Sequence, residues 1–270
     1  MLQRKGARKG TDIPKNVLQL LQQGQLETVN LTEWLAIDHV VLLDYALTEF
    51  GLQRSSDVFL SELDHLKEKK MMKIIPAIAR AWLNLLKPQT PQERTRLFDA
   101  MATHRSDSIR CWAAYIVGID PHLSLEEKLV GIRPFAADSH FGVREIAWMA
   151  VRESISLQLL EGLALLHSWV RDENANIRRF AIELTRPQGV WAKHIPELKV
   201  HPELALPLLE AVQSDPAKYV QDSVGNWLND ASKTKPDWVI QVCDTWLMTS
   251  NTKETKRIVT RAQRSLNKMK

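Results

Sequence analysis

Asp172-Glu-Asn-Ala-Asn-Ile-Arg-Arg-Phe-Ala181 is the stretch that decides the fold, because its pattern recurs along the chain. Thirty-four residues earlier, Asp138-Ser-His-Phe-Gly-Val-Arg-Glu-Ile-Ala147 places Asp, a β-branched residue, Arg and Ala at the same positions. Another 34 residues back, Ser108-Ile-Arg-Cys-Trp-Ala113 again has the β-branched residue, the Arg and the Ala, while His104 occupies the Asp position. Forty-three residues after the first stretch, Asp215-Pro-Ala-Lys-Tyr-Val-Gln-Asp-Ser-Val224 restores the pattern, with Gln in the Arg position. A repeat of about 20 to 50 residues is typical of a solenoid.

The composition favours helices. The chain of 270 residues is 44% hydrophobic, contains only ten Gly, and has no alternating runs rich in Val, Ile and Thr. We therefore predict an all-α fold, a curved α-α superhelix of HEAT-like or ARM-type repeats, in which each helix pair covers the apolar stripe of the next. Before residue 91, helices are expected from Pro14, over 30–51, over 57–70 and over 71–87. The pairs expected after it are 91–103 with 106–119, 124–133 with 141–154, 156–170 with 176–185, 202–213 with 219–234, and 237–249 with 253–267.

The charge is concentrated at the two ends of the chain. The formal net charge is +4, of which residues 1–16 carry +4 and residues 253–270 carry +6, so the remainder sums to −6. Residues 1–12 are predicted to form a flexible basic arm, and residues 13–270 a single repeat domain. Basic ends on a mildly acidic body indicate contact with a polyanion, and solvated tails are the equally weighted alternative.

Several classes of protein are disfavoured. The two cysteines, Cys111 and Cys243, lie far apart in helical patterns and indicate neither a disulfide framework nor a metal site. No apolar run approaches the roughly 18 residues of a membrane span, and no hydrophobic region follows the basic N-terminal residues. We expect a cytoplasmic monomer without metal or cofactor.

The recurring Asp and Arg are predicted to be structural. The Asp precedes the second helix of each repeat and can cap it, while the Arg six residues later can reach the Asp of an adjoining repeat. This ladder accounts for Asp138, Arg144, Asp172 and Arg178, which we do not assign to chemistry.

Three sets of side chains beside the ladder do not recur and are the candidates for function. Each is expected on one inner helix, so that aromatic, acidic and basic groups face one groove. Core packing of the aromatic residues and a solvated or paired carboxylate are the alternative interpretation. The sets are Phe141, Glu145 and Trp148; Arg179, Glu183 and Arg186; and Asp222, Asn226 and Trp227 with Asn229 and Asp230.

Two segments resemble a known family. Asn176-Ile-Arg-Arg-Phe-Ala-Ile-Glu183 with Arg186, Pro187 and Trp191 is one, and Tyr219-Val-Gln-Asp-Ser-Val-Gly-Asn-Trp-Leu-Asn-Asp-Ala-Ser-Lys-Thr-Lys-Pro-Asp237 is the other. They are similar to the bacterial HEAT-like repeat DNA alkylation repair proteins, the AlkD/AlkC superfamily. The opening 3–8 with Ile13-Pro14 also looks like one branch of that superfamily.

The resemblance implies a fold, a partner and a site. Its members hold duplex DNA in a basic concave groove, and its characterised enzymes excise N3- and N7-alkylated purines without flipping the base into a pocket. Phe141 corresponds to a Trp of the family, Glu145 to its catalytic Asp and Arg179 to its Arg, which holds the DNA backbone. Asn226 or Trp227 falls at a second aromatic position.

We therefore predict an alkylpurine DNA glycosylase whose catalytic residues are Glu145, Phe141 and Arg179. One alternative is a non-catalytic protein that binds bent or branched DNA by shape, and a weaker one is a protein–protein scaffold. Loop inserts such as 186–196 often lie on the working face of a solenoid. The predicted DNA-binding residues are Trp148, Arg186, Lys193, Asn226, Trp227, Arg4, Lys5 and Arg8.

Overall fold

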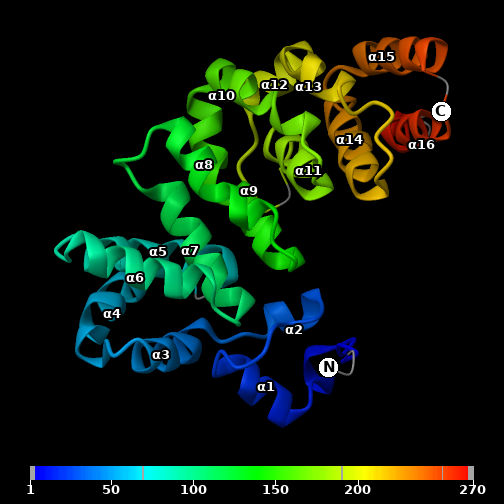
Figure 1. The fold of residues 1–270 in the computed structure, drawn as a ribbon. Helices are drawn as coiled ribbons and strands as arrows, with labels where there is room; N and C mark the ends of the chain where they lie inside the picture. Colours follow the sequence, from blue (N-terminus) through cyan, green and yellow to red (C-terminus); the bar gives the residue numbers. More distant parts are fainter. Residues whose placement is uncertain (1–3, 69, 190, 251, 267–270) are drawn as a thin grey trace. The chain divides into compact units, whose positions relative to one another are not determined.

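The computed structural model describes residues 4–68, 70–189, 191–250 and 252–266, and within these ranges every regular element is a helix (Figure 1). The prediction of an all-α chain is confirmed. The first elements are η1 Gly10–Asp12, α1 Lys15–Gln22, α2 Leu31–Leu35, α3 His39–Glu49, η2 Gln53–Ser55, α4 Ser56–Asp64, α5 Met71–Leu86, α6 Pro91–Ala102 and α7 Asp107–Ile119. They are followed by α8 Leu125–Ala136, α9 Phe141–Leu157, α10 Leu159–Leu166, η3 Trp169–Arg171, α11 Ala175–Leu184, α12 Pro196–Val200, η4 Pro202–Ala205, α13 Leu206–Glu210, α14 Lys218–Ala231, α15 Pro236–Thr249 and α16 Lys253–Ala262.

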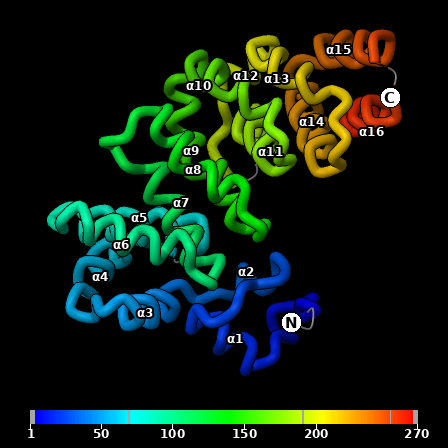
Figure 2. Tube along the Cα trace, in the orientation of Figure 1, coloured from blue at the N-terminus to red at the C-terminus, as the bar shows by residue number. Residues whose placement is uncertain are grey.

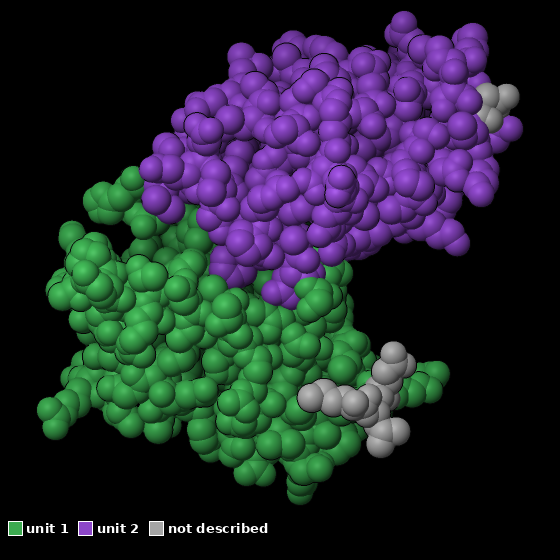
Figure 3. All heavy atoms as spheres, in the orientation of Figure 1, with its two compact units in different colours: residues 1–122, 139–150 green, residues 123–138, 151–270 purple. Residues whose placement is uncertain are grey.

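The chain packs as two compact units, coloured separately in Figure 3. Unit 1 comprises residues 1–122 and 139–150, and unit 2 comprises 123–138 and 151–270, so α9 contributes to both. The predicted arm belongs to unit 1, and its residues 1–3 lie outside the described residues. The chain can be followed through the helices in Figure 2. None of the described helices is long and apolar enough to cross a membrane.

The predicted helices are present, with local differences both before and after residue 91. Residues 202–213 form the 3-10 segment η4 and the short helix α13 instead of one helix. The segment 30–51 is interrupted, because the Asp38 carboxylate accepts the backbone N–H of Val40 at 2.9 Å and starts α3 as a new helix. The short helix α12 was not predicted.

In unit 1, α5 packs against α4 and α7. Trp82 on α5 is fully buried, and its ring meets Phe59 edge-on at 5.2 Å and Phe50 edge-on at 5.9 Å between centroids. Edge-to-face aromatic pairs at these distances stabilise a core beyond the area they bury. The apolar stripe of α5 is thus covered from two sides.

In unit 2, α14 packs against both α11 and α16. Trp227 is fully buried, and its indole N–H donates to the Thr185 carbonyl at 3.0 Å. Gly225 allows the close approach of α16, because a Cβ at this position would lie 2.8 Å from the Cβ of Arg261. Small size at this position therefore sets the spacing of these two helices.

The predicted ladder is confirmed between α11 and α14. The Arg178 guanidinium donates to the Asp215 carboxylate at 2.6 and 2.9 Å, which is the expected bond from one repeat to the Asp of the next. The same guanidinium donates to the carbonyl of Asp172 at 2.8 Å, just before its own helix. Gln221, which replaces Arg in the last repeat, makes the equivalent bond to the Asp215 carbonyl at 2.7 Å.

The prediction that the repeat Asp caps its helix is wrong by two residues, because Asn174 and Ala217 are the N-cap residues of α11 and α14. The Asp side chain instead closes the turn just before the helix, and this role explains His104. Asp172 accepts the N–H of Asn174 at 2.8 Å, and Asp215 accepts the N–H of Ala217 at 2.9 Å. His104 Nδ1 accepts the N–H of Ser106 at 2.9 Å, so the imidazole performs the task of the missing carboxylate. Burial lowers the pKa of His104 despite the nearby Glu49 carboxylate, which keeps Nδ1 available as an acceptor.

This pairing predicts the stability of two matched variants at Asp215. Asp215→Ala removes both the acceptor of the Ala217 N–H and the partner of Arg178, and we expect it to lower the unfolding free energy by about 2–4 kcal/mol. Asp215→Asn retains an acceptor for that N–H but loses the charge pair, so its stability should lie between those of Asp215→Ala and wild type, by about 1 kcal/mol or more from the Ala variant. Urea denaturation measures all three, and equal stability of the Ala and Asn variants would show that the bond to the Ala217 N–H contributes nothing.

Candidate functional site

The first two turns of α9 hold Phe141 and Glu145, four residues apart on one helix face and both half-buried. The start of the helix is fixed by His140, whose Nδ1 accepts the N–H of Gly142 at 3.1 Å. His140 Nε2 donates to the Thr28 carbonyl at 2.7 Å. Unit 1 therefore ties the residue next to Phe141 to a segment more than a hundred positions away in sequence.

The network behind His140 is buried. The Thr28 hydroxyl donates to Asp107 Oδ2 at 3.0 Å, and the Thr28 N–H donates to Asp107 Oδ1 at the same distance. Burial raises the pKa of Asp107 above its ordinary value, against the lowering effects of His140 and of the two bonds from Thr28. Asp107, only 1% exposed, thus anchors the segment to which His140 bonds.

Phe141 is held by aromatic neighbours. Its ring lies 5.8 Å from Trp34 in an edge-on arrangement and 4.6 Å from the His140 ring. Trp34 also packs against Gly142, where a Cβ would come within 2.8 Å of the indole. Trp34 and His140 therefore hold one part of the Phe141 ring in place, while the residue stays partly accessible to solvent.

Glu145 is oriented by Trp148. The indole N–H of Trp148 donates to Glu145 Oε2 at 2.8 Å. Trp148 itself is 1% exposed, so its ring belongs to the core and does not offer the apolar surface to a ligand that the sequence suggested. Its contribution to this site is the hydrogen bond that holds the carboxylate.

A second cluster lies in unit 2, on α11 and α14. The Arg179 guanidinium lies 4.2 Å from the centre of the Tyr219 ring, a cation–π geometry, and 3.7 Å from Glu183. Tyr219 is half-buried and was missed by the sequence reasoning. Its position in the repeat could have identified it, because Tyr219 lies in the first turn of α14 as Phe141 lies in the first turn of α9.

The cluster continues inward as a buried ion-pair network. Arg186 donates to Glu183 at 3.1 Å and to Asp230 at 2.6 and 2.9 Å, and Ser223 donates to Glu183 at 2.7 Å. Burial alone would raise the pKa of Glu183, but Arg179, Arg186 and the two hydrogen bonds outweigh it and lower that pKa. Arg186, predicted to bind DNA, is 7% exposed and directed into this network.

Asn226 and Trp227, the two alternatives for a second aromatic position, differ in environment. Trp227 is fully buried, so its ring is core. The Asn226 side-chain oxygen accepts from Arg261 at 3.0 Å and from Arg264 at 2.9 Å, and so it holds two cations of the basic C-terminal segment. Lys268 and Lys270 of that segment lie outside the described residues.

The remaining predicted contacts are near the surface. Lys5, Arg8 and Lys193 are exposed, and Lys193 Nζ lies 2.9 Å from Glu153. Arg4 has an internal partner, because its guanidinium lies 2.5 Å from the buried Glu33 carboxylate and donates to the Glu27 carbonyl at 2.8 Å. Arg4 therefore fastens the arm to the segment that precedes α2.

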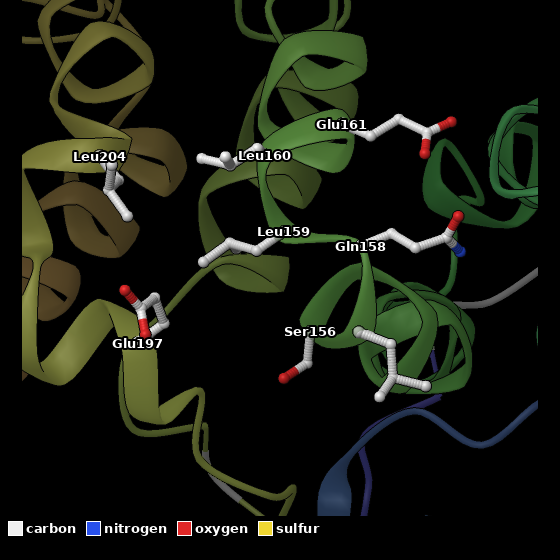
Figure 4. Close-up of a pocket in the computed structure, with 8 residues that line it drawn as sticks. Ser156, Gln158, Leu159, Leu160, Glu161, Glu197 and Leu204 are labelled. Atoms are coloured by element: carbon white, nitrogen blue, oxygen red, sulfur yellow. The ribbon is translucent and has the colours of Figure 1, made fainter.

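An open hollow in unit 2 offers a different chemistry (Figure 4). Leu159, Leu160 and Leu204 line it, and Glu161 and Glu197 supply two carboxylates. Carboxylates repel phosphate, so this hollow does not fit a polyanion.

Comparison with known proteins finds a family model that matches part of the chain. Residues 143–262, less than half of the chain, match the model described as DNA alkylation repair enzyme. This segment contains Glu145, Arg179 and Tyr219. The predicted resemblance to DNA alkylation repair proteins is confirmed over it.

A curated relative and two solved structures are similar to this chain. The protein YhaZ of Bacillus subtilis is 40% identical over 119 residues, which cover 44% of this chain and 33% of the relative. Alkylpurine DNA glycosylase AlkC of Pseudomonas fluorescens was solved bound to DNA containing an abasic site analog, and its structure matches this one with a TM-score of 0.69 at 21% identity. That match covers 97% of this chain and 66% of the AlkC chain. AlkD2 of Streptococcus mutans matches with a TM-score of 0.58 at 24% identity, over 77% of this chain and 97% of the AlkD2 chain. At these identities the two structures show a shared fold.

The depressed pKa of Glu183 sets an expected pH dependence. Because its folded pKa lies below the ordinary 4.5, the carboxylate stabilises the fold above that pH, and this contribution is lost as the pH falls through the folded pKa. Glu183→Gln should lower the unfolding free energy by about 3 kcal/mol at pH 7. The difference from wild type should shrink progressively in denaturation curves taken below pH 4.5. A difference independent of pH would contradict a role for the charge.

Proposed function

We propose that this protein binds double-stranded DNA and excises N3- or N7-alkylated purines by hydrolysing the N-glycosidic bond without base flipping, with Glu145 as the catalytic carboxylate. The observation that carries the proposal is the fixed pair of Phe141 and Glu145 on the first two turns of α9, within reach of solvent and oriented by the Trp148 N–H. The family match of residues 143–262 supports it, as does the fold shared with a DNA-bound alkylpurine glycosylase.

The chemistry suits a single carboxylate. An alkylated purine carries a positive charge, so it leaves with the electron pair of the C1′–N bond as a neutral base and needs no general acid. Positive charge then develops on the deoxyribose, and an adjacent anion stabilises it. Glu145 supplies that anion and takes the proton of the water that adds to C1′.

Phe141 and Trp148 have separate tasks in this mechanism. The Phe141 ring, backed by Trp34 and His140, gives the sugar an apolar surface beside the carboxylate. Trp148 is a positioning residue, because its N–H holds Glu145 in one orientation. Preorganised groups avoid the cost of reorientation during the reaction.

DNA contact in unit 2 rests on Arg179 and on exposed cations. Arg179, 8% exposed and stacked on Tyr219, is the proposed contact to the DNA backbone through the little of its surface that is accessible. Arg186, 7% exposed, supports it through their shared partner Glu183. Lys193, with Lys5 and Arg8 of the arm, supplies further phosphate contacts. Asn226 contributes by holding Arg261 and Arg264.

The excision proposal predicts loss of base release in Glu145→Gln. We expect wild type to release 3-methyladenine or 7-methylguanine from methylated duplex DNA and the variant to be slower by about 100-fold or more, while DNA affinity changes little. Release of free base is measured by chromatography. Glu161→Gln, which neutralises an exposed carboxylate on α10, is the matched control and should keep full activity. If Glu145→Gln releases base as fast as wild type, the proposed mechanism is wrong. If wild type binds DNA but releases no base, the protein is instead a non-catalytic one that recognises DNA by its shape.

DNA binding itself predicts a steep dependence on salt. Each phosphate contact releases a counterion, so log Kd should rise linearly with log salt concentration. Lys5→Ala, Arg8→Ala and Lys193→Ala should each reduce the slope by about one, and Lys87→Ala, an exposed lysine after α5, should leave it unchanged. Fluorescence anisotropy with a labelled duplex measures the slope. No binding at low salt would rule out both DNA functions and leave the protein scaffold.

A further inference from the structure

The loop between α11 and α12 is built around a buried cation. Arg152 is 3% exposed and donates to the carbonyls of Leu184 at 2.7 Å, Arg186 at 2.5 Å and Lys193 at 2.8 Å. Burial, with the nearby Arg186, lowers the pKa of Arg152 to about 10, so the guanidinium is charged at neutral pH. Charge-assisted bonds to carbonyls on both sides of the loop fix its conformation at its two ends.

Other contacts secure the middle of the loop. The Ile195 N–H donates to the Pro187 carbonyl at 3.1 Å, and the Ile195 side chain is 1% exposed. A Cβ at Gly189 would lie 3.0 Å from the guanidinium carbon of Arg152. The Lys233 ammonium, from the end of α14, donates to Gln188 at 3.0 Å. The loop is thus anchored to the body of unit 2.

Trp191 projects from this anchored loop. All nine tryptophans lie within the described residues, and Trp191 alone is exposed, at 52%, whereas the others are buried or, for Trp238, half-buried. Its φ of 58° lies in the left-handed region, which an L-residue with a bulky side chain rarely adopts. Backbone strain at an exposed aromatic residue gains no core packing, and strain of this kind is often found where a protein contacts a ligand.

The neighbouring charges indicate the kind of ligand. Lys193 and His194 in the same loop are exposed, and Lys233 reaches the loop from α14. An aromatic ring beside cations matches a nucleic acid, which offers base faces for stacking and phosphates for the ammonium groups. The carboxylate-lined hollow of unit 2 lacks such cations among its lining residues.

We propose that Trp191 stacks on a base of the bound DNA at an unpaired or opened position, with Lys193 and Lys233 contacting the flanking phosphates. This inference rests on the proposed DNA-binding function and adds to it a specific recognition element. A base at a mismatch or opposite a lesion leaves the stack at lower cost than a normally paired one, so it can reach such a ring without flipping of the alkylated base. Trp191 would thereby favour disrupted duplex over intact duplex.

Three variants test the stacking role. Trp191→Gly removes the indole and relieves the positive φ, so the fold should be retained with a melting temperature equal to or above that of wild type. Its affinity for duplex DNA with one unpaired base should fall by about 5- to 100-fold, the range for loss of one base–aromatic stack. Trp191→Phe should keep most of the affinity, and Met248→Ala, which trims an 81% exposed apolar side chain on α15, should bind as wild type does.

The salt dependence separates stacking from charge effects. Trp191→Gly should weaken binding equally at every salt concentration, because no phosphate contact is lost, while Lys233→Ala should reduce the slope by about one. Equal affinity of wild type and Trp191→Gly would overturn the stacking proposal while leaving DNA binding intact. A wild-type protein that binds no DNA would instead overturn the proposed function on which it rests. Equal loss in the Gly and Phe variants would also contradict stacking.

Discussion

The geometry of unit 2 depends on the guanidinium of Arg178. It binds the carbonyl that precedes its own helix and the carboxylate of Asp215 in the following repeat. Asp215 in turn accepts the N–H of Ala217 and so closes the turn that precedes α14. Because the Arg fork is planar and rigid, these bonds fix the starts of α11 and α14 against each other. Tyr219 lies in the first turn of α14 and Arg179 in the second turn of α11, so the contact between them depends on that fixation.

In unit 1, hydrogen bonds of a buried histidine, His140, fix the first turn of α9. His140 takes the capping role for Gly142 and is itself held by Thr28, whose hydroxyl bonds to Asp107. The same imidazole lies against Phe141. A single buried side chain therefore caps the helix and supports the ring beside Glu145, the carboxylate proposed to be catalytic. In both units, residues that build the repeat also position the residues proposed to act on DNA.

The repeat period predicted the helices and the ladder because both depend on local spacing and on simple charge pairing. It could not predict how deeply each turn of a helix is buried along the axis. Residues at i, i+4 and i+7 lie within about 60° of one another around a helix, so they share a face. Phe141 and Glu145 stay half-buried near the start of α9, whereas Trp148, further along the same face, is buried. Arg186 was placed by helical spacing, yet α11 ends at Leu184 and the chain turns inward there.

The environments of Tyr219 and Trp191 depend on tertiary contacts, which the spacing of residues in the sequence does not reveal. The contact of Tyr219 with Arg179 joins two repeats separated by an irregular insert, so it depends on the length and path of that insert. The exposure of Trp191 depends on Arg152, a residue of a different helix that gathers three loop carbonyls. Tertiary hydrogen bonds of this kind leave no periodic signal in the sequence.

The buried charges of unit 2 bear on the proposed DNA recognition in two ways. Glu183 and Asp230 pair with Arg186, and Glu183 also lies near Arg179, so much of this positive charge is already balanced inside the protein. Attraction of a polyanion must then come mainly from exposed lysines and arginines, whose contribution is weakened by salt. Arg179 is held in place by Tyr219 and Glu183, so in the proposed complex it would add a fixed point of contact. Affinity would come from mobile surface cations, and the placement of the lesion from the few groups that cannot move.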